Sequence, residues 1–153
     1  SVTGNYAYTN ARYRRFVDDN LQTVLLRAGL PAMDFNGKFL PYVPQHKAVI
    51  SPRVTVPIDE KSSFEFRSDF SMQSESYVRA DNLQRFAAFS VVDLRGTLRH
   101  GNMYLQVFAN NVFNNATPVA GVRFFDSTNF SIASPLITGA NRRQIGASVG
   151  MRF

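Results

Sequence analysis

The sequence predicts an all-β fold of antiparallel strands, and three observations support this prediction. Apolar and polar side chains alternate with a period of two over several segments, which places them on opposite faces of a strand and does not suit a helix. The connections between these segments alternate between short and long. The closing segment, 145–153, alternates without a break and ends on an aromatic residue.

Six segments are expected to form strands, and the first two show the pattern less regularly than the others. In chain order the six segments are 5–15, 46–57, 64–77, 89–99, 103–110 and 145–153. The first has Tyr6 and Tyr8 on one face, but its alternation becomes irregular after Asn10. The second alternates except at Pro52, which removes one backbone donor from the strand ladder.

The last four segments have the strongest two-faced pattern. Their apolar residues are, in order, Phe64, Phe66, Phe70 and Met72; Val92, Leu94 and Leu98; Met103, Leu105, Val107 and Ala109; and Ile145, Ala147, Val149, Met151 and Phe153. Polar, charged or small residues stand between them, although Tyr104 and Phe108 fall on the polar side of the fifth segment. Each of these segments therefore meets an apolar medium on one face and a polar medium on the other.

The polar faces carry many charges. Glu65, Arg67, Asp69, Asp93 and Arg95 would all point to the same side of the sheet. Between the two sheets of a soluble β-sandwich such charges would be costly unless they were paired. In a wide, water-filled lumen they cost much less. These five residues are therefore predicted to line the inner wall of a barrel.

The connections favour the same interpretation. Short turns lie near residues 59–61 and 100–102, whereas the other connections, 16–44, 78–88 and 114–141, are long. Loops of that size are unusual in compact soluble domains. Short turns at one rim and long loops at the other are typical of outer-membrane barrels, whose strands alternate between apolar-out and polar-in positions. The apolar medium is therefore predicted to be lipid.

Composition argues against several other classes of protein. The chain has no cysteine, and His46 and His100 stand alone without the neighbours that a zinc site needs. No enzymatic activity, metal or cofactor is predicted. The net charge of +6 comes from basic residues scattered along the chain, so nucleic-acid binding is not expected. No apolar run is long enough for a transmembrane helix.

Four segments, in this order along the chain, resemble parts of one protein family. They are GNYAYTN at 4–10, LPYVPQH at 40–46, LQVFANNVFN at 105–114 and RQIGASVGMRF at 143–153. Together they resemble the carboxy-terminal part of TonB-dependent outer-membrane receptors, which are active transporters for iron-siderophores, cobalamin and some carbohydrates. Two positions differ from the family pattern, because Val112 replaces the usual leucine and no tyrosine follows Asn115 where one is common.

The resemblance implies a fold and a location. Residues 1–153 would be the carboxy-terminal part of one transmembrane β-barrel domain, about six strands out of about 22. The plug domain is expected outside this chain. The implied location is the outer membrane of a Gram-negative bacterium, with lipid around the barrel and a TonB-type energy-transducing protein acting through the plug. The barrel-assembly machinery would recognise the last strand, at Val149, Met151 and Phe153.

The resemblance also implies uptake of a scarce small molecule, with an iron-siderophore as the expected ligand. The candidate ligand-binding residues in the long loops are Arg79, Asp81, Arg85, Arg123, Phe124, Phe125, Asp126, Asn141, Arg142 and Arg143. Arginines and aromatic rings suit an anionic chelate, but the same residues would also serve as solvated loop residues or as partners of lipopolysaccharide phosphates. Two other functions stay open: a passive porin-like channel and a soluble all-β binding module.

Overall fold

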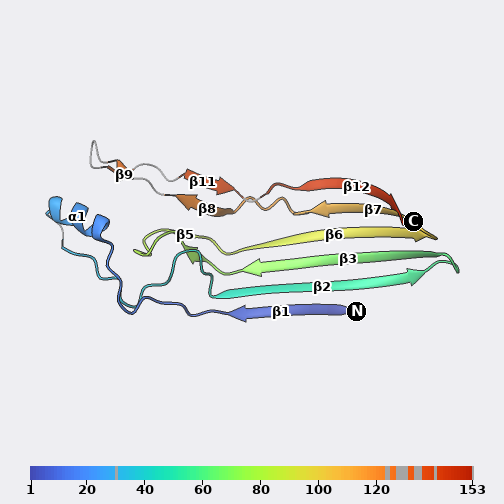
Figure 1. Ribbon diagram of the computed structural model, residues 1–153, viewed down its shortest axis with the longest axis horizontal. Helices are drawn as coiled ribbons and strands as arrows, with labels where there is room; N and C mark the ends of the chain where they lie inside the picture. Colours follow the sequence, from blue (N-terminus) through green and yellow to red (C-terminus); the bar gives the residue numbers. More distant parts are fainter. Residues whose placement is uncertain (30, 123–124, 127–130, 133–135, 140, 153) are drawn as a thin grey trace.

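The computed structural model confirms the all-β prediction and contains a six-stranded antiparallel sheet (Figure 1). It describes residues 1–29, 31–122, 125–126, 131–132, 136–139 and 141–152. The strands of this sheet are β1 (Val2–Tyr8), β2 (His46–Pro57), β3 (Ser62–Gln73), β6 (Phe89–His100), β7 (Met103–Asn110) and β12 (Gln144–Met151). Their order in space is their order along the chain, so each strand pairs with the ones before and after it.

The six predicted strands correspond to these six, with corrections at their ends. The first prediction, 5–15, is too late, because β1 begins at Val2 and ends at Tyr8. After Tyr8 the chain pairs with the returning loop instead of β2, as the N–H of Tyr13 donates to the carbonyl of Lys38. The third prediction, 64–77, is too long, because residues 76–77 form a separate strand. The last prediction, 145–153, includes Phe153, which lies outside the described residues.

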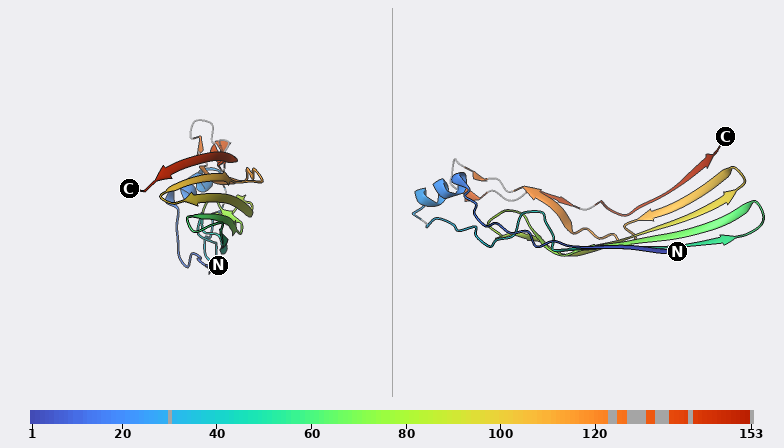
Figure 2. Two further views of the ribbon diagram at one scale, coloured as in Figure 1. Left: turned by 90° about the vertical axis from the view of Figure 1, so that its right-hand side faces the viewer. Right: turned by 60° about the horizontal axis from the view of Figure 1, so that its bottom comes forward.

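Short and long connections lie at opposite ends of the sheet (Figure 1). Residues 58–61 join β2 to β3, and Gly101 and Asn102 join β6 to β7. Gly101 has φ +54°, a conformation that glycine adopts without strain. The long connections gather at the other end, so the molecule is elongated, with the curved sheet at one end and the loops at the other (Figure 2).

Asp59 stabilises the β2–β3 turn by accepting a hydrogen bond from the N–H of Lys61 at 2.8 Å. This bond and those from Ser62 hold the pKa of Asp59 below its ordinary value. A carboxylate with a lowered pKa adds stability above its unfolded pKa and loses it as the pH falls through the folded value.

We expect acidification to loosen this turn in the acid range, by a small amount because Asp59 is fully exposed. Hydrogen exchange at the Lys61 amide should increase at low pH in the wild type. In Asp59→Asn the same amide should show no such carboxylate titration. Equal pH profiles for the two proteins would contradict this role of Asp59.

The chain also contains short elements outside the six-stranded sheet, and of these residues 76–77 alone fall within a predicted strand. The elements are α1 (Asp19–Arg27), β4 (Ser76–Tyr77), β5 (Arg85–Phe86), β8 (Pro118–Val122), β9 (Phe125–Asp126), β10 (Ser131–Ile132) and β11 (Leu136–Gly139). β4 pairs with β5, β8 with β11 and β9 with β10. Within the described part of the chain, no helix has the length and apolar character needed to cross a membrane.

The hydrophobic core of the described residues lies among the loops. Phe35, Val78 and Phe86 are the buried apolar side chains there, with Phe35 only 1% exposed. Two of them pair with aromatic rings, since the ring centroids of Phe16 and Phe35 lie 5.4 Å apart and those of Tyr42 and Phe86 lie 5.8 Å apart. The main sheet contributes none of these buried apolar residues, so it packs against no second layer within the described chain.

A turn after β7 joins this loop region to the sheet through Asn111. Its side chain donates to the carbonyls of Asn115 and Asn141 at 2.8 and 2.7 Å, and its own N–H donates to Asp93 at 2.7 Å. Asn111 is 5% exposed and has φ +50°. The end of the LQVFANNVFN segment, from Asn111, therefore forms a structural turn that connects β6, β7 and the approach to β12.

Two substitutions at Asn111 separate its side chain from its backbone conformation. Asn111→Gly keeps the positive φ and is expected to lower the free energy of unfolding by about 2 kcal/mol, through the lost amide hydrogen bonds. Asn111→Ala must also adopt a conformation that alanine disfavours, which costs about 1 kcal/mol more. Urea unfolding in detergent micelles measures both values. Equal destabilisation by the two substitutions would show that the positive φ at this position does not determine stability.

Candidate functional site

One face of the sheet is apolar across its whole width. The strand register aligns Val54, Phe66, Gly96, Val107 and Ala147 in one row from β2 to β12. The rows on either side are aligned in the same way. The predicted apolar sets of the separate strands therefore combine into a single surface, which we call the apolar face.

The apolar face is exposed. Its large side chains that are more than a third exposed are Val2, Tyr6, Tyr8, Ile50, Val54, Val56, Phe64, Phe66, Met72, Leu98, Met103, Leu105, Val107, Ile145, Val149 and Met151. Ile145 and Val149 on the edge strand reach 76% and 72%. Contiguous apolar surfaces of this kind are rare on soluble monomers and indicate a membrane or protein contact.

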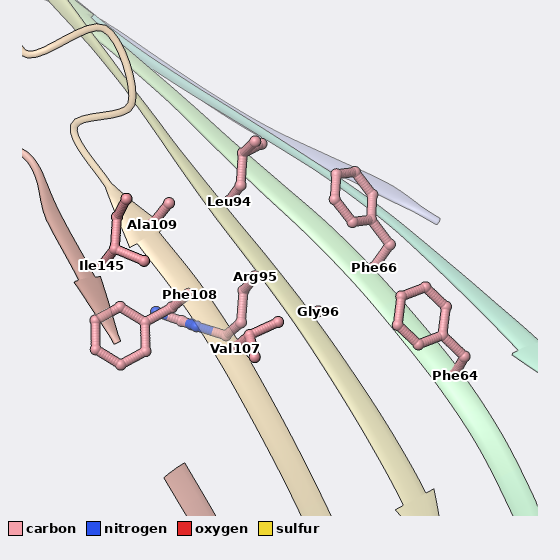
Figure 3. A pocket seen from close by; sticks show the side chains of 9 residues that line it. All are labelled: Phe64, Phe66, Leu94, Arg95, Gly96, Val107, Phe108, Ala109 and Ile145. Carbon is pink, nitrogen blue, oxygen red and sulfur yellow. The ribbon is translucent and has the colours of Figure 1, made fainter. Parts of the chain in front are cut away.

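A shallow hollow lies in the middle of the apolar face (Figure 3). It measures about 370 Å³. Besides Gly96, its lining consists of Phe64, Phe66, Leu94, Arg95, Val107, Phe108, Ala109 and Ile145. Gly96 forms part of its lining, because glycine has no side chain to fill the space between Phe64 and Val107. The hollow is lined almost entirely by apolar atoms and contains no cluster of groups suited to catalysis.

At the loop end of the apolar face, three rings form a small cluster. The hydroxyl of Tyr6 lies 2.7 Å from Nδ1 of His46. The ring centroid of Tyr8 lies 5.2 Å from that of His46. Tyrosines with a wet hydroxyl and an apolar ring are enriched where lipid meets water. The cluster therefore marks one boundary of the apolar face.

The opposite face carries the five predicted wall residues, and the structure brings them together. Arg67 stands in register with Arg95, and Asp69 stands in register with Asp93. Nη2 of Arg67 lies 2.8 Å from Oδ1 of Asp69 on the same strand. Glu65 lies next to this group on β3. We call this side of the sheet the polar face.

Two aromatic rings on the polar face cover glycines of β12. Phe108 stands opposite Gly146, and Tyr104 stands opposite Gly150. A Cβ added at Gly146 would lie 2.6 Å from Cζ of Phe108, and one added at Gly150 would lie 2.5 Å from Cε1 of Tyr104. Both glycines therefore leave the space that these rings occupy beside the last strand.

The predicted ligand residues of the second long loop make contacts within the loop region. Nη2 of Arg79 lies 3.6 Å from Oδ2 of Asp18, which caps α1. Nη1 of Arg85 lies 2.8 Å from Oε2 of Glu75. Asp81 is 6% exposed and accepts the N–H of Leu83. The side chains of Arg79 and Arg85 are 37% and 66% exposed, so ligand contact at these two arginines stays a prediction.

The remaining predicted ligand residues lie in or near the last long loop. Arg142 is exposed, and the N–H of Arg143 donates to Asn114 at 3.1 Å. The carbonyl of Asn141 accepts from Asn111. Arg123 and Phe124 fall outside the described residues, and for Phe125 and Asp126 the structure gives only the backbone of β9. Their predicted role is therefore untested.

The structure adds a loop pocket that the sequence analysis missed. A cavity of about 480 Å³ lies beside α1, lined by Arg14, Arg15, Phe16, Val17, Gln22, Leu26, Ala32, Met33, Asp34 and Asn36. The Gln22 amide holds its wall by bonding both the N–H and the carbonyl of Met33. Phe16 packs on Tyr13 with ring centroids 4.6 Å apart. Paired arginines beside aromatic residues were the available signal, but only the fold brings 14–17 and 32–36 together.

Metal chemistry has no candidate site in the part of the chain that the structure describes, where no three histidine, cysteine, aspartate or glutamate side chains cluster. The chain matches no protein-family model, no curated protein and no solved structure. The geometry of the two faces and the loops is therefore the basis for a functional proposal.

Proposed function

We propose that this chain forms part of the wall of an outer-membrane β-barrel, and that the barrel belongs to a TonB-dependent transporter. The observation that carries the membrane proposal is the apolar face, which is continuous across six strands and is covered by no other described part of the chain. Lipid is the partner that we propose for this face. The charged polar face then lies toward water, and the aromatic cluster of Tyr6, Tyr8 and His46 lies at a lipid boundary.

The open edges of the sheet support a larger barrel. β1 and β12 each have one strand partner among the described residues. Unpaired backbone groups at an edge are prohibitive in lipid, and the smallest membrane barrels need about eight strands. We therefore propose that further strands outside this chain close the barrel, in line with the about 22 strands of the family that the sequence resembles.

The function that fits best is uptake of a scarce anionic ligand, with an iron-siderophore as the proposed cargo. The large loop region supports this proposal, because it is folded around its own core and contains the cavity beside α1. Apolar and polar residues line this cavity in equal number, and small-molecule sites combine apolar walls with polar groups that orient the ligand. Arg14 and Arg15 supply positive charge, and Arg79, Arg85, Arg142 and Arg143 lie on the same loop end of the molecule.

Two experiments test the proposal in sequence. The first asks whether the protein needs detergent or lipid to stay folded; a monomer that is folded in buffer alone would contradict the membrane proposal and favour the soluble binding module. The second deletes the gene and measures growth and radioactive iron-siderophore uptake under iron limitation. We expect both to fall and to return with the wild-type gene. Normal uptake in the deletion strain would contradict the proposed cargo.

A passive porin-like channel is the alternative that the charged polar face supports. An open channel would conduct ions in a planar bilayer, whereas a transporter whose lumen is plugged would not.

The double variant Arg14→Gln with Arg15→Gln tests the cavity beside α1 as the ligand site. It removes two positive charges beside α1 and leaves the sheet unchanged. Reduced uptake with normal membrane insertion is expected. Unchanged uptake would exclude this cavity as the ligand site.

A further inference from the structure

Three arginines on adjacent strands stand directly opposite one another on the polar face. Arg53 of β2 is in register with Arg67 of β3, and Arg67 is in register with Arg95 of β6. We call these three residues the arginine row. Opposed side chains in antiparallel strands have Cβ atoms about 5 Å apart, so the Cβ atoms of the three arginines span about 10 Å.

The neighbouring carboxylates compensate this charge unequally. Asp69 accepts hydrogen bonds from Nε and Nη2 of Arg67 at 2.9 and 2.8 Å, and from the hydroxyl of Ser51. Asp93 accepts the backbone N–H of Asn111. Asp69 therefore forms an ion pair with the central arginine, Arg67, whereas Asp93 is hydrogen-bonded to the turn after β7.

The two outer arginines have weaker partners. Nε of Arg53 lies 3.9 Å from Oε1 of Glu65, beyond hydrogen-bonding distance, and the Arg53 side chain is 46% exposed. Among the described residues, no carboxylate forms an ion pair with Arg95 within 4.0 Å. Like charges in direct opposition destabilise a sheet, so the arginine row carries a repulsion that the described side chains only partly relieve.

The polar face as a whole is also cationic. Its charged residues within the six strands are Lys47, Arg53, Arg67, Arg95 and Arg99 against Glu65, Asp69 and Asp93. Five basic and three acidic residues leave an excess of two positive charges over the same strands. A cationic wall raises the local concentration of anions, and the arginine row places three of its five basic residues in register on adjacent strands.

We propose that the arginine row binds a small phosphate-bearing solute between Arg53 and Arg95. The inference rests on the proposed function in one respect, because the barrel places the polar face toward the lumen. Guanidinium groups hold phosphate oxygens through paired N–H donors. A bound phosphate group also removes the repulsion between opposed arginines, so binding and relief of strain act in the same direction.

The probe is inorganic pyrophosphate, titrated calorimetrically into the protein in detergent micelles, with sodium chloride at matched ionic strength as the blank. Arg95→Gln is the test variant. Arg99→Gln is the matched control, because it makes the same charge change on the same strand and face outside the arginine row. We expect binding to the wild type, a loss of about tenfold in Arg95→Gln, and a change below about twofold in Arg99→Gln.

The outcomes separate the two proposals. Equal losses of pyrophosphate binding in the two variants would show that the net charge of the polar face attracts the anion, without a specific site, and would overturn the inference. No binding above the chloride blank would also overturn it. Should Arg95→Gln fail to fold, Arg53→Gln tests the other end of the row with the same expected loss. The need for detergent or lipid is measured without pyrophosphate. If the protein inserts in membranes but binds no pyrophosphate, only the proposed phosphate site at the arginine row is therefore contradicted.

Discussion

Val107→Arg is expected to prevent stable insertion of the sheet into lipid. Val107 lies in the central row of the apolar face and is 53% exposed. An arginine on the lipid face of a membrane barrel costs about 2–4 kcal/mol near the middle of the bilayer. In a soluble sheet the same exposed side chain would be solvated at almost no cost. The substitution therefore distinguishes lipid from water as the medium at this face.

The neighbouring residue supplies the control. Gln106 is on the polar face of the same strand, and Gln106→Arg is expected to lose its hydrogen bond to Thr97 at a cost of about 1 kcal/mol while inserting normally. Outer-membrane fractionation and urea unfolding in lipid vesicles measure the two variants side by side. Equal insertion of both would show that the face assignment is wrong.

Gly146→Val is expected to separate the last strand from β7. The new Cβ would lie 2.6 Å from Cζ of Phe108, so the ring must move or the strands must part. Forcing extra atoms into a close-packed position costs about 1–3 kcal/mol. Ser148→Val is the matched control, because it adds a β-branched side chain to the same face of β12 away from the ring.

A double substitution identifies the cause. If the clash with the ring is the reason, Phe108→Ala should recover most of the stability that Gly146→Val loses, and the two changes should be strongly non-additive. Urea unfolding in lipid vesicles gives the four free energies of the cycle. Additive losses would mean that glycine at 146 is needed for a reason other than the Phe108 ring.

The sheet could be predicted because its determinants are local. Period-two alternation fixed which residues share a face, and the register confirms that these sets align across all six strands. The end of β1 could not be predicted, since it depends on Arg12 and Tyr13 meeting the returning loop at Gly37 and Lys38. α1 was missed although Asp18 and Arg27 are typical helix-end residues, because its short, exposed pattern has no buried stripe.

In the candidate sites too, local features could be predicted from the sequence and features that depend on distant contacts could not. Alternation was enough to assign Glu65, Arg67 and Asp69 to the polar face. It could not show that Arg67 stands between two other arginines, because that depends on the pairing of three strands. The loop arginines were selected by residue type alone. Salt bridges such as Arg79 with Asp18 join residues far apart in the sequence, and no local pattern indicates them.

The neighbour-to-neighbour order of the six strands has a consequence for how this architecture grows. Because every strand pairs with the strand before or after it in the sheet, contacts form between hairpin partners without threading the chain through earlier structure. This order is compatible with stepwise addition of strands to the sheet, and most contacts join residues far apart in the sequence. It also makes the hairpin a modular unit: duplication or loss of one would widen or narrow the wall by two strands and leave every other pairing intact.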